Sequence, residues 1–432
     1  MPGWGGLRRF KRQWIAGLTF GLLAIVCGLF YMFGYWRIMW LSVAPLWYGL
    51  ILLGLGFFWA ALATRRFFWQ VLTWSPRDGD ESAANKVLLR GPKIVVVGGG
   101  SGLGMILRGL KKITSNLTAI VTVADDGGSS GRIRKEFGIL PPGDIRSCLI
   151  ALADIEPLME QLMQYRFNGG TGLAGHSFGN LFLTAMTEIT GDFDQAIRAS
   201  SQVLAVRGRV LPSTLENVVL KAELVDGEII QGESAIGKSP TRIRQLSMEP
   251  AEVQPVPEAV SAIAEADIII LGPGSLYTSI IPNLLVRETA EAIRRSSALK
   301  VYICNAMTQP GETVGYSAAD HVQAIIDHAG PGLIDYVLIN IKSIPKEMLE
   351  RYQEEGASPV VADLARVRAL GVEPLSSPLI LTQDFVRHDA DQLSSIVLGL
   401  LRTTEGRHGR LRFRVMRRIR RLIRIVAGMV HV

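Results

Sequence analysis

A glycine-rich turn between an apolar strand and a helix constrains the fold of this chain more than any other feature. Residues 94–104 read IVVVGGGSGLG, and the run Ile94–Val97 is apolar and ends in glycines. Such a run is typical of a strand buried on both faces of a parallel sheet. Residues Leu103–Leu110 have a helical pattern, so backbone N–H groups at the helix start would face the turn. The sequence therefore predicts a strand, an anion-binding turn and a helix in succession.

A pair of aspartates follows the next apolar run. Residues Ala119–Val123 lead into the sequence ADDGGSSGR. Because the carboxyl ends of parallel strands meet at one edge of a sheet, Asp125 and Asp126 should lie beside the glycine turn. Carboxylates in that place accept hydrogen bonds from a ribose or hold Mg²⁺ next to phosphates. Glycine turns also serve packing alone, but that explanation does not account for the aspartates, the serines and Arg132 together.

Apolar strands alternate with amphipathic stretches from Lys93 to about Arg402, which predicts a Rossmann-like, doubly wound α/β fold with a mainly parallel sheet. Residues 217–235 instead alternate apolar and polar residues around Asp226 and Gly227. This pattern predicts an antiparallel hairpin insertion. The expected strands are 94–97, 119–123, 268–271, 301–303 and 336–340, and the expected helices include 145–164, 179–190 and 286–296.

Two uncharged apolar runs precede this domain, at residues 14–36 and 38–64. Each is longer than the roughly 20 residues that cross a bilayer as a helix. A cleaved signal peptide is the alternative, but the first run is too long, lacks a small-residue cleavage site and is followed by a second run. Basic residues flank the two runs on both outer sides, while only Arg37 lies between them. We therefore expect a transmembrane hairpin in the inner (cytoplasmic) membrane, with both termini and the globular domain in the cytoplasm.

The net charge of +7 is concentrated at the two ends of the chain, and the remainder is mildly acidic. Nine arginines occur in residues 407–424 and alternate with apolar residues at helical spacing, which predicts a basic amphipathic helix. Anionic lipid is the favoured partner of this tail, with nucleic acid or a disordered tail as alternatives.

The three cysteines are scattered, so neither a disulfide framework nor a CxxC metal site is expected. The expected regions are a basic flank with the hairpin (1–66), a linker (67–92), the α/β domain (93–403) and the tail (404–432).

Two further motifs precede expected helices. In PPGDIR, Asp144 could cap the following helix while Arg146 could reach a phosphate. The sequence GHSFGN resembles a nucleophile elbow only loosely, and no triad partner is evident. A helix start with Ser177 as the cap and Asn180 facing a ligand is the favoured interpretation. His176 as a metal ligand or general base is the alternative, although a lone histidine is more often structural.

Two loops later in the chain also follow apolar strands. Residues 272–279, GPGSLYTS, form a second strand, glycine turn and helix unit, suited to a pyrophosphate or a sugar. Residues 304–313, CNAMTQPGET, carry neutral groups that hydrogen-bond bases and sugar hydroxyls, although a plain surface loop has a similar composition. Two phosphate-type turns in one domain predict a ligand of dinucleotide or nucleotide-sugar size.

Taken in order, GGGSGLG, DDGGSSGR, PPGDIRSCLIAL, GHSFGN, GPGSLYTSIIPNL and NAMTQPGET resemble the signature of the CofD-like family, and within it the YvcK-like gluconeogenesis factors. The resemblance covers about Lys93 to Arg402 and implies a site between the glycine loop, the aspartate loop and the GPGS turn. It implies binding of UDP-N-acetylglucosamine and an influence on cell shape, wall synthesis and gluconeogenic growth. Arg387-His388-Asp389 resembles the RHD segment of this branch, whose arginine is expected to help hold the UDP-sugar.

These features together predict a membrane-anchored regulator that binds a UDP-sugar. The alternative is a Mg²⁺-dependent transferase like the CofD relatives, which move a phospholactyl-type group from a nucleotide diphosphate donor. In that case Asp125 or Asp126 would hold the metal, and Arg132 or Arg146 would stabilise developing charge. No convincing nucleophile or general base is evident, and an NAD-linked oxidoreductase is disfavoured by the imperfect dinucleotide fingerprint.

Mg²⁺ at Asp125 and Asp126 is the one cofactor considered. The expected partners are the UDP-sugar, membrane lipids, wall-synthesis or regulatory proteins and further copies of the chain, but not nucleic acid. The expected ligand-binding residues are Gly99, Gly100, Ser101, Gly102, Asp125, Asp126, Ser129, Arg132, Asp144, Arg146, Ser177, Asn180, Gly272, Gly274, Ser275, Tyr277, Asn305, Thr308, Gln309, Arg387 and His388.

Overall fold

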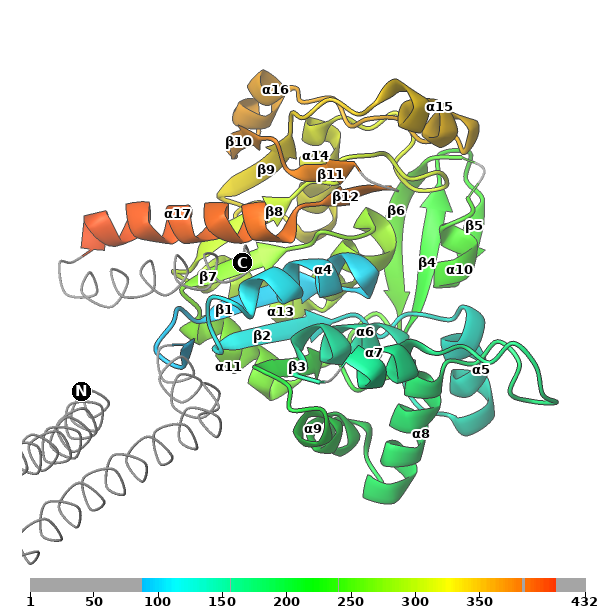
Figure 1. Cartoon of the computed structure of the whole chain (residues 1–432). Helices are drawn as coiled ribbons and strands as arrows, with labels where there is room; N and C mark the ends of the chain where they lie inside the picture. Colours follow the sequence, from blue (N-terminus) through cyan, green and yellow to red (C-terminus); the bar gives the residue numbers. More distant parts are fainter. Residues whose placement is uncertain (1–87, 156, 240, 383–384, 409–432) are drawn as a thin grey trace, which may run out of the picture. The chain divides into compact units, whose positions relative to one another are not determined.

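The computed structural model describes residues 88–408 apart from 156, 240, 383 and 384, with side chains up to residue 402 (Figure 1). The two apolar runs of the expected hairpin, nearly all of the linker and residues 409–432 of the tail lie outside the described residues. Within the described part, none of the helices combines the length and the apolar character that a membrane span requires.

A parallel sheet of seven strands forms the centre of the described residues. Its strands are β1 Ile94–Gly98, β2 Leu117–Val121, β3 Arg209–Pro212, β7 Ile268–Leu271, β8 Leu299–Ile303, β9 Tyr336–Asn340 and β10 Glu373–Ser377. Their order is β10-β9-β8-β7-β1-β2-β3, and every neighbouring pair is parallel. The chain runs outward from β1 to β3 and then returns to β7 on the other side of β1. The ends of β1 and β7 therefore form the switch point at which doubly wound sheets bind ligands.

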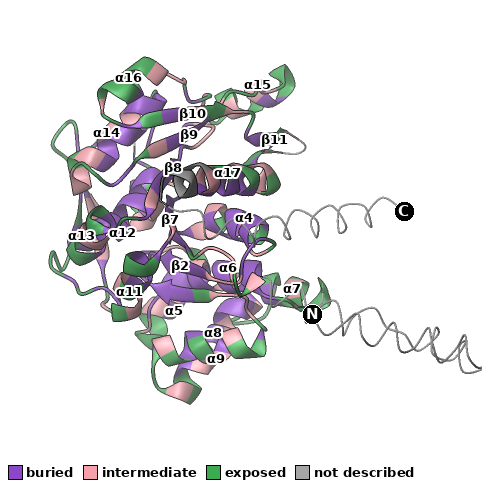
Figure 2. Cartoon of the chain, turned by 90° about the vertical axis from the view of Figure 1, so that its left-hand side faces the viewer, coloured by how far each residue is buried: buried purple, intermediate pink, exposed green. Residues whose placement is uncertain are grey.

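Helices cover both faces of this sheet. In chain order the main helices are α4 Gly100–Leu110, α5 Gly128–Phe137, α6 Gly143–Leu152, α7 Pro157–Gln164, α8 Phe178–Thr190, α9 Phe193–Val203, α11 Pro257–Glu265, the π-helix η1 Leu276–Ile280, α12 Ile281–Leu285, α13 Arg287–Arg295, α14 Ala318–Ala329, α15 Lys346–Glu354, α16 Leu364–Ala369 and α17 Ala390–His408. Figure 2 shows α4, α6 and α17 on one side of the sheet and α11 to α14 on the other. All residues of β1, β2 and β7 are buried, as strands covered on both faces require.

Two small antiparallel sheets are added to this frame. The first contains β4 Val219–Leu224, β5 Ile229–Gln231 and β6 Ile243–Glu249, with the short helix α10 Glu233–Ile236 between β5 and β6. The pairing of β4 with β5 confirms the predicted hairpin, whereas β6 was not predicted. The second sheet pairs β11 Ile380–Thr382 with β12 Val386–His388 and was also not predicted.

The observed boundaries correct two expectations. Strand β2 covers 117–121 rather than 119–123, so Asp125 lies on a loop beyond the strand end. The expected single helix 145–164 is wrong, because α6 ends at Leu152 and α7 begins at Pro157. A proline has no N–H for the helix and disfavours helical geometry in the residue before it, so a new helix starts there.

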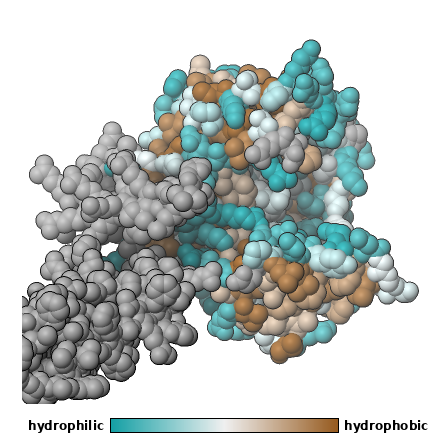
Figure 3. All heavy atoms as spheres, viewed as in Figure 1, coloured by the Kyte–Doolittle hydropathy of each residue, from teal (hydrophilic) through white to brown (hydrophobic). Residues whose placement is uncertain are grey.

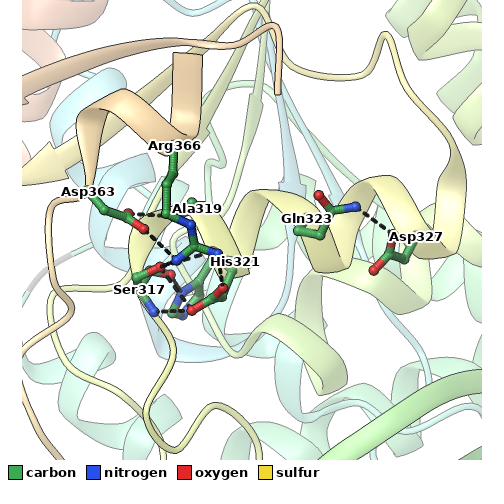
Figure 4. A network of polar contacts seen from close by, with 8 residues as sticks. Ser317, Ala319, His321, Gln323, Asp327, Asp363 and Arg366 are labelled. Carbon is green, nitrogen blue, oxygen red and sulfur yellow. Dashed lines mark hydrogen bonds and ion pairs between the residues drawn. The ribbon is translucent and has the colours of Figure 1, made fainter. Parts of the chain in front are cut away.

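A polar network fixes the start of α14 (Figure 4). Ser317 accepts the N–H of Asp320, and Asp320 accepts the N–H of Ser317 at 2.8 Å, which forms a capping box. Arg366 of α16 donates to Asp320 at 2.9 Å, while Asp363 accepts the N–H of Ala319 at 2.9 Å. These bonds join α14 to α16 and hold the C-terminal end of the loop that follows β8.

Candidate functional site

A cavity of about 880 Å³ lies at the switch point of the sheet. The loops after β1, β7 and β8 line it together with parts of α4, α6, α10, α15 and the β11–β12 hairpin. Segments far apart in the sequence therefore meet there. The predicted ligand residues that line the cavity are Gly99, Gly100, Ser101, Gly102, Asp125, Asp144, Gly274, Ser275, Asn305, Thr308, Gln309, Arg387 and His388.

The other predicted ligand residues do not line this cavity: Asp126, Ser129, Arg132, Arg146, Ser177, Asn180, Gly272 and Tyr277. The carboxylate of Asp126 accepts the N–H of Ser234 at 2.8 Å. Of the two adjacent aspartates, only Asp125 lines the cavity. Asn180 is buried and donates to the hydroxyl of Ser129 at 3.0 Å. Ser177 accepts the N–H of Asn180 at 3.2 Å and so caps α8 as predicted.

A polar cluster lies around the start of α8. His176 is buried, and its Nδ1 lies 3.1 Å from the hydroxyl of Ser129. Arg146 donates to the hydroxyl of Ser177, and Arg132 donates to the carbonyl of Ala174 at 2.9 Å. These contacts join α5, α6 and the loop before α8. His176 therefore serves as a structural hydrogen-bonding group in this arrangement.

The glycine turns after β1 and β7 lie against each other. A Cβ placed on Gly102 would lie 2.6 Å from the carbonyl oxygen of Pro273, so this approach requires a glycine. The side chain of Asn283 on α12 donates to the carbonyls of Gly98 at 3.0 Å and Ser279 at 2.7 Å. The two turns are thus joined into one rigid wall of the cavity.

Carboxylates of the chain itself occupy the anion-binding positions at both helix starts. Glu312, which is only 4% exposed, accepts the backbone N–H of Tyr277 at 3.0 Å and the hydroxyl of Thr278 at 3.1 Å. That N–H is therefore not available to a pyrophosphate. Asp144 accepts the N–H of Gly100 at the start of α4. It lies within the first turn of α6 and makes no cap, so the predicted capping role was wrong.

Three carboxylates line one side of the cavity: Asp125, Asp144 and Glu233. Burial, followed by repulsion from Asp125, raises the pKa of Asp144 to about 7. The same two causes raise the pKa of Glu233 to about 7. Among the described residues no group of three His, Cys, Asp or Glu is arranged to hold a metal ion. The oxygen donors are nevertheless of the type that Mg²⁺ uses when phosphates complete its shell.

Basic and neutral groups lie elsewhere on the cavity wall. Arg108 of α4 lines the cavity and forms an ion pair with Glu160 of α7 at 2.8 Å. The guanidinium of Arg387 lies over the ring of Phe385, 5.6 Å from its centre. His388 is buried, and burial lowers its pKa to about 4, so the imidazole is neutral at pH 7. The cavity therefore combines an acidic side with separate basic and neutral groups.

Known proteins that are similar to this chain identify its family. Residues 94–380 match the family described as 2-phospho-L-lactate transferase CofD. The chain belongs to the CofD family. It is 52% identical to the gluconeogenesis factor of Bacillus subtilis, over 72% of this chain and 98% of that protein. It is also 52% identical to the gluconeogenesis factor of Halalkalibacterium halodurans, over 71% of this chain and 95% of that protein.

A solved structure has a similar fold. A crystal structure of a protein from Bacillus halodurans aligns with a TM-score of 0.70 and 51% identity, over 71% of this chain and 99% of that one. The resemblance to the gluconeogenesis factors of the CofD family is thereby confirmed.

Proposed function

We propose that this member of the CofD family binds UDP-N-acetylglucosamine and regulates cell shape, wall synthesis and gluconeogenic growth from the cytoplasmic face of the membrane. The observation that carries the proposal is the cavity at the switch point. Its volume of about 880 Å³ is within the range of small-molecule sites. Neutral hydrogen-bonding groups, two arginines and an acidic side suit a ligand with a base, a sugar and a charged linker.

Each part of such a ligand has matching groups. Asn305, Thr308 and Gln309 follow β8 and offer neutral donors and acceptors to a base or a sugar. Arg108 and Arg387 bear the charges that attract a diphosphate. The acidic side would repel the same diphosphate unless a cation lies between them.

Mg²⁺ suits that role. The three carboxylates, Asp125, Asp144 and Glu233, do not form a complete metal site by themselves, so phosphate oxygens of the ligand would have to supply part of the shell. An ion between the acidic side and the diphosphate would neutralise the diphosphate and orient it. The same acidic side favours the alternative function, a Mg²⁺-dependent transferase acting on a nucleotide diphosphate donor. The pKa values of Asp144 and Glu233 are near 7, and such groups exchange protons readily at neutral pH.

Calorimetric titration separates the two functions. Residues 88–408 are titrated with UDP-N-acetylglucosamine, with and without Mg²⁺, and the mixture is then assayed for nucleotide products. We expect binding that Mg²⁺ strengthens and no turnover. Stoichiometric release of UMP would contradict the regulator and support the transferase, whereas the absence of binding under both conditions would contradict the proposed ligand.

Arg387→Ala tests the placement of the ligand. A hydrogen bond to a charged group contributes about 1.5–3 kcal/mol, so we expect affinity for UDP-N-acetylglucosamine to fall at least about 10-fold. Arg387→Lys should retain part of the affinity because it keeps the charge without the planar donors. Arg287→Ala is the control, since this arginine is exposed on α13 and does not line the cavity. Unchanged affinity in Arg387→Ala would remove this residue from the site.

We also propose that the hairpin and the basic tail hold the domain at the membrane. The chain 88–432 should bind anionic vesicles more tightly than 88–408, because arginines near the surface contribute about 1 kcal/mol each. The difference should shrink as salt is added. Vesicle cosedimentation measures it, and equal binding by the two chains would contradict a role of the tail.

A further inference from the structure

Helix α7 presents its apolar face to solvent. Leu158 is 76% exposed, and Met159 and Leu162 are about 40% exposed, while Met163 is the buried residue of the helix. Tyr165, which is half-exposed, extends the same face beyond the helix end. Figure 3 shows hydrophobic residues gathered over α7 and α8 in the lower part of the view. Patches of this kind on a soluble domain usually mark an interaction surface.

Arginines continue from this face toward the loop before α8. Arg166 follows Tyr165 and donates to the carbonyl of Gly175 at 2.6 Å, and Arg132 donates to the neighbouring carbonyl of Ala174 at 2.9 Å. Arg146 reaches the same loop through Ser177. In the described part of the chain, Arg132, Arg146 and Arg166 form no ion pair with an acid.

The electrostatics show that these positive charges repel one another. Arg166 lowers the pKa of Arg146, and Arg132 and Arg166 both lower the pKa of His176, in each case after the larger effect of burial. Asp144 and Asp125 oppose this effect at Arg146, and Glu136 opposes it at His176. A guanidinium without an ion-pair partner at an accessible surface is well placed for an external anion such as a phosphate.

We propose that these two features form one docking surface for an anionic lipid bilayer. The lipid-facing surface consists of Leu158, Met159, Leu162, Tyr165, Arg132 and Arg166. Apolar side chains of an interfacial helix enter the boundary between headgroups and acyl chains, and tyrosine suits that boundary. The neighbouring arginines bind the lipid phosphates. A free phosphate would satisfy only the arginines, whereas a bilayer satisfies both features.

The test uses residues 88–408, which lack the expected hairpin and most of the tail. The gluconeogenesis factor of Bacillus subtilis consists almost entirely of the matching region, so this region exists as a protein of its own. Its cosedimentation is measured with vesicles of phosphatidylcholine and with vesicles that also contain phosphatidylglycerol. We expect binding to the second kind only, weakened by salt.

Matched variants identify the surface. Leu158→Ser combined with Leu162→Ser should weaken vesicle binding at least about 10-fold, because both apolar side chains that would enter the bilayer are lost. Arg166→Gln should weaken it about 5-fold and reduce its salt dependence, while Arg166→Lys should restore most of the loss. Ile229→Ser and Arg244→Gln, which change exposed residues of the β4–β5–β6 sheet, should have no effect.

Several outcomes would overturn the proposal. These are the absence of vesicle binding, equal binding by every variant, and displacement of the bound protein by inorganic phosphate at constant ionic strength. A concentration-dependent self-association that the Leu158→Ser, Leu162→Ser variant abolishes, without vesicle binding, would assign the face to a second copy of the chain. Calorimetry with UDP-N-acetylglucosamine should be unchanged in all these variants, so the proposed ligand is tested separately.

Discussion

Glu312→Ala should lower the free energy of unfolding by about 3 kcal/mol and weaken binding of UDP-N-acetylglucosamine more than 10-fold. The carboxylate accepts the N–H of Tyr277 and the hydroxyl of Thr278, and both are buried. Each buried polar group left without a partner costs about 1–3 kcal/mol. Without this acceptor, the start of η1 and the turn between β7 and η1 would shift. That turn forms part of the cavity wall, so ligand binding would weaken as well.

Glu312→Gln separates the loss of hydrogen bonds from the loss of charge. The amide oxygen can still accept the N–H of Tyr277, and the amide nitrogen can donate to the hydroxyl of Thr278. We therefore expect a loss of only about 1 kcal/mol in chemical denaturation. Glu350→Ala, at an exposed position of α15, is the control. A Glu312→Ala protein as stable as the parent would contradict the assigned role of this carboxylate.

Asp144→Asn should increase the stability of the ligand-free protein at pH 8 by about 2 kcal/mol and leave it nearly unchanged at pH 4. Burial and repulsion from Asp125 raise the pKa of Asp144 from 3.8 to about 7. The same causes raise the pKa of Glu233 from 4.5 to about 7. The folded protein therefore binds more protons than the unfolded chain between about pH 4 and pH 7. The contribution of these two groups to the free energy of unfolding therefore falls as pH rises through that window.

Urea denaturation from pH 4 to pH 8 measures this effect. Relative to Asp144→Asn, the parent protein should lose stability as pH rises, because the variant lacks one of the raised pKa values. Asp391→Asn is the matched control, since Asp391 lies in an exposed ion pair with Lys112. Identical pH profiles for the parent and Asp144→Asn would show that Asp144 does not titrate in this range.

The sequence predicted the parts of the fold that depend on local pattern. Apolar runs with glycine turns identified β1 and β7, and the sequence around Asp226 and Gly227 identified the β4–β5 hairpin. The motifs after β1 and β7 also contribute part of the cavity lining. Strands β3 and β10 were missed because they are short and carry polar or proline residues.

Residues that reach the cavity from distant segments could not be predicted in the same way. Glu233 lines the cavity only because the insertion folds back toward the sheet, and neighbouring residues in the sequence do not indicate this. Asp125 and Asp126 are adjacent in the chain, yet Asp126 turns to the start of α10. Glu312 was visible within the NAMTQPGET motif, but its partners Tyr277 and Thr278 belong to another motif. Pairings between motifs require the tertiary fold.

The ion pair between Arg108 and Glu160 connects the two surfaces of this domain. Arg108 lines the cavity, while Glu160 belongs to the helix that carries the lipid-facing surface. A diphosphate that draws Arg108 away would leave an uncompensated negative charge on α7, next to an anionic bilayer. By thermodynamic reciprocity, nucleotide-sugar and lipid would then weaken each other's binding by the same factor. Because both side chains are more than 40% exposed, their pairing contributes about 1 kcal/mol or less, so that antagonism is graded and at most about 5-fold.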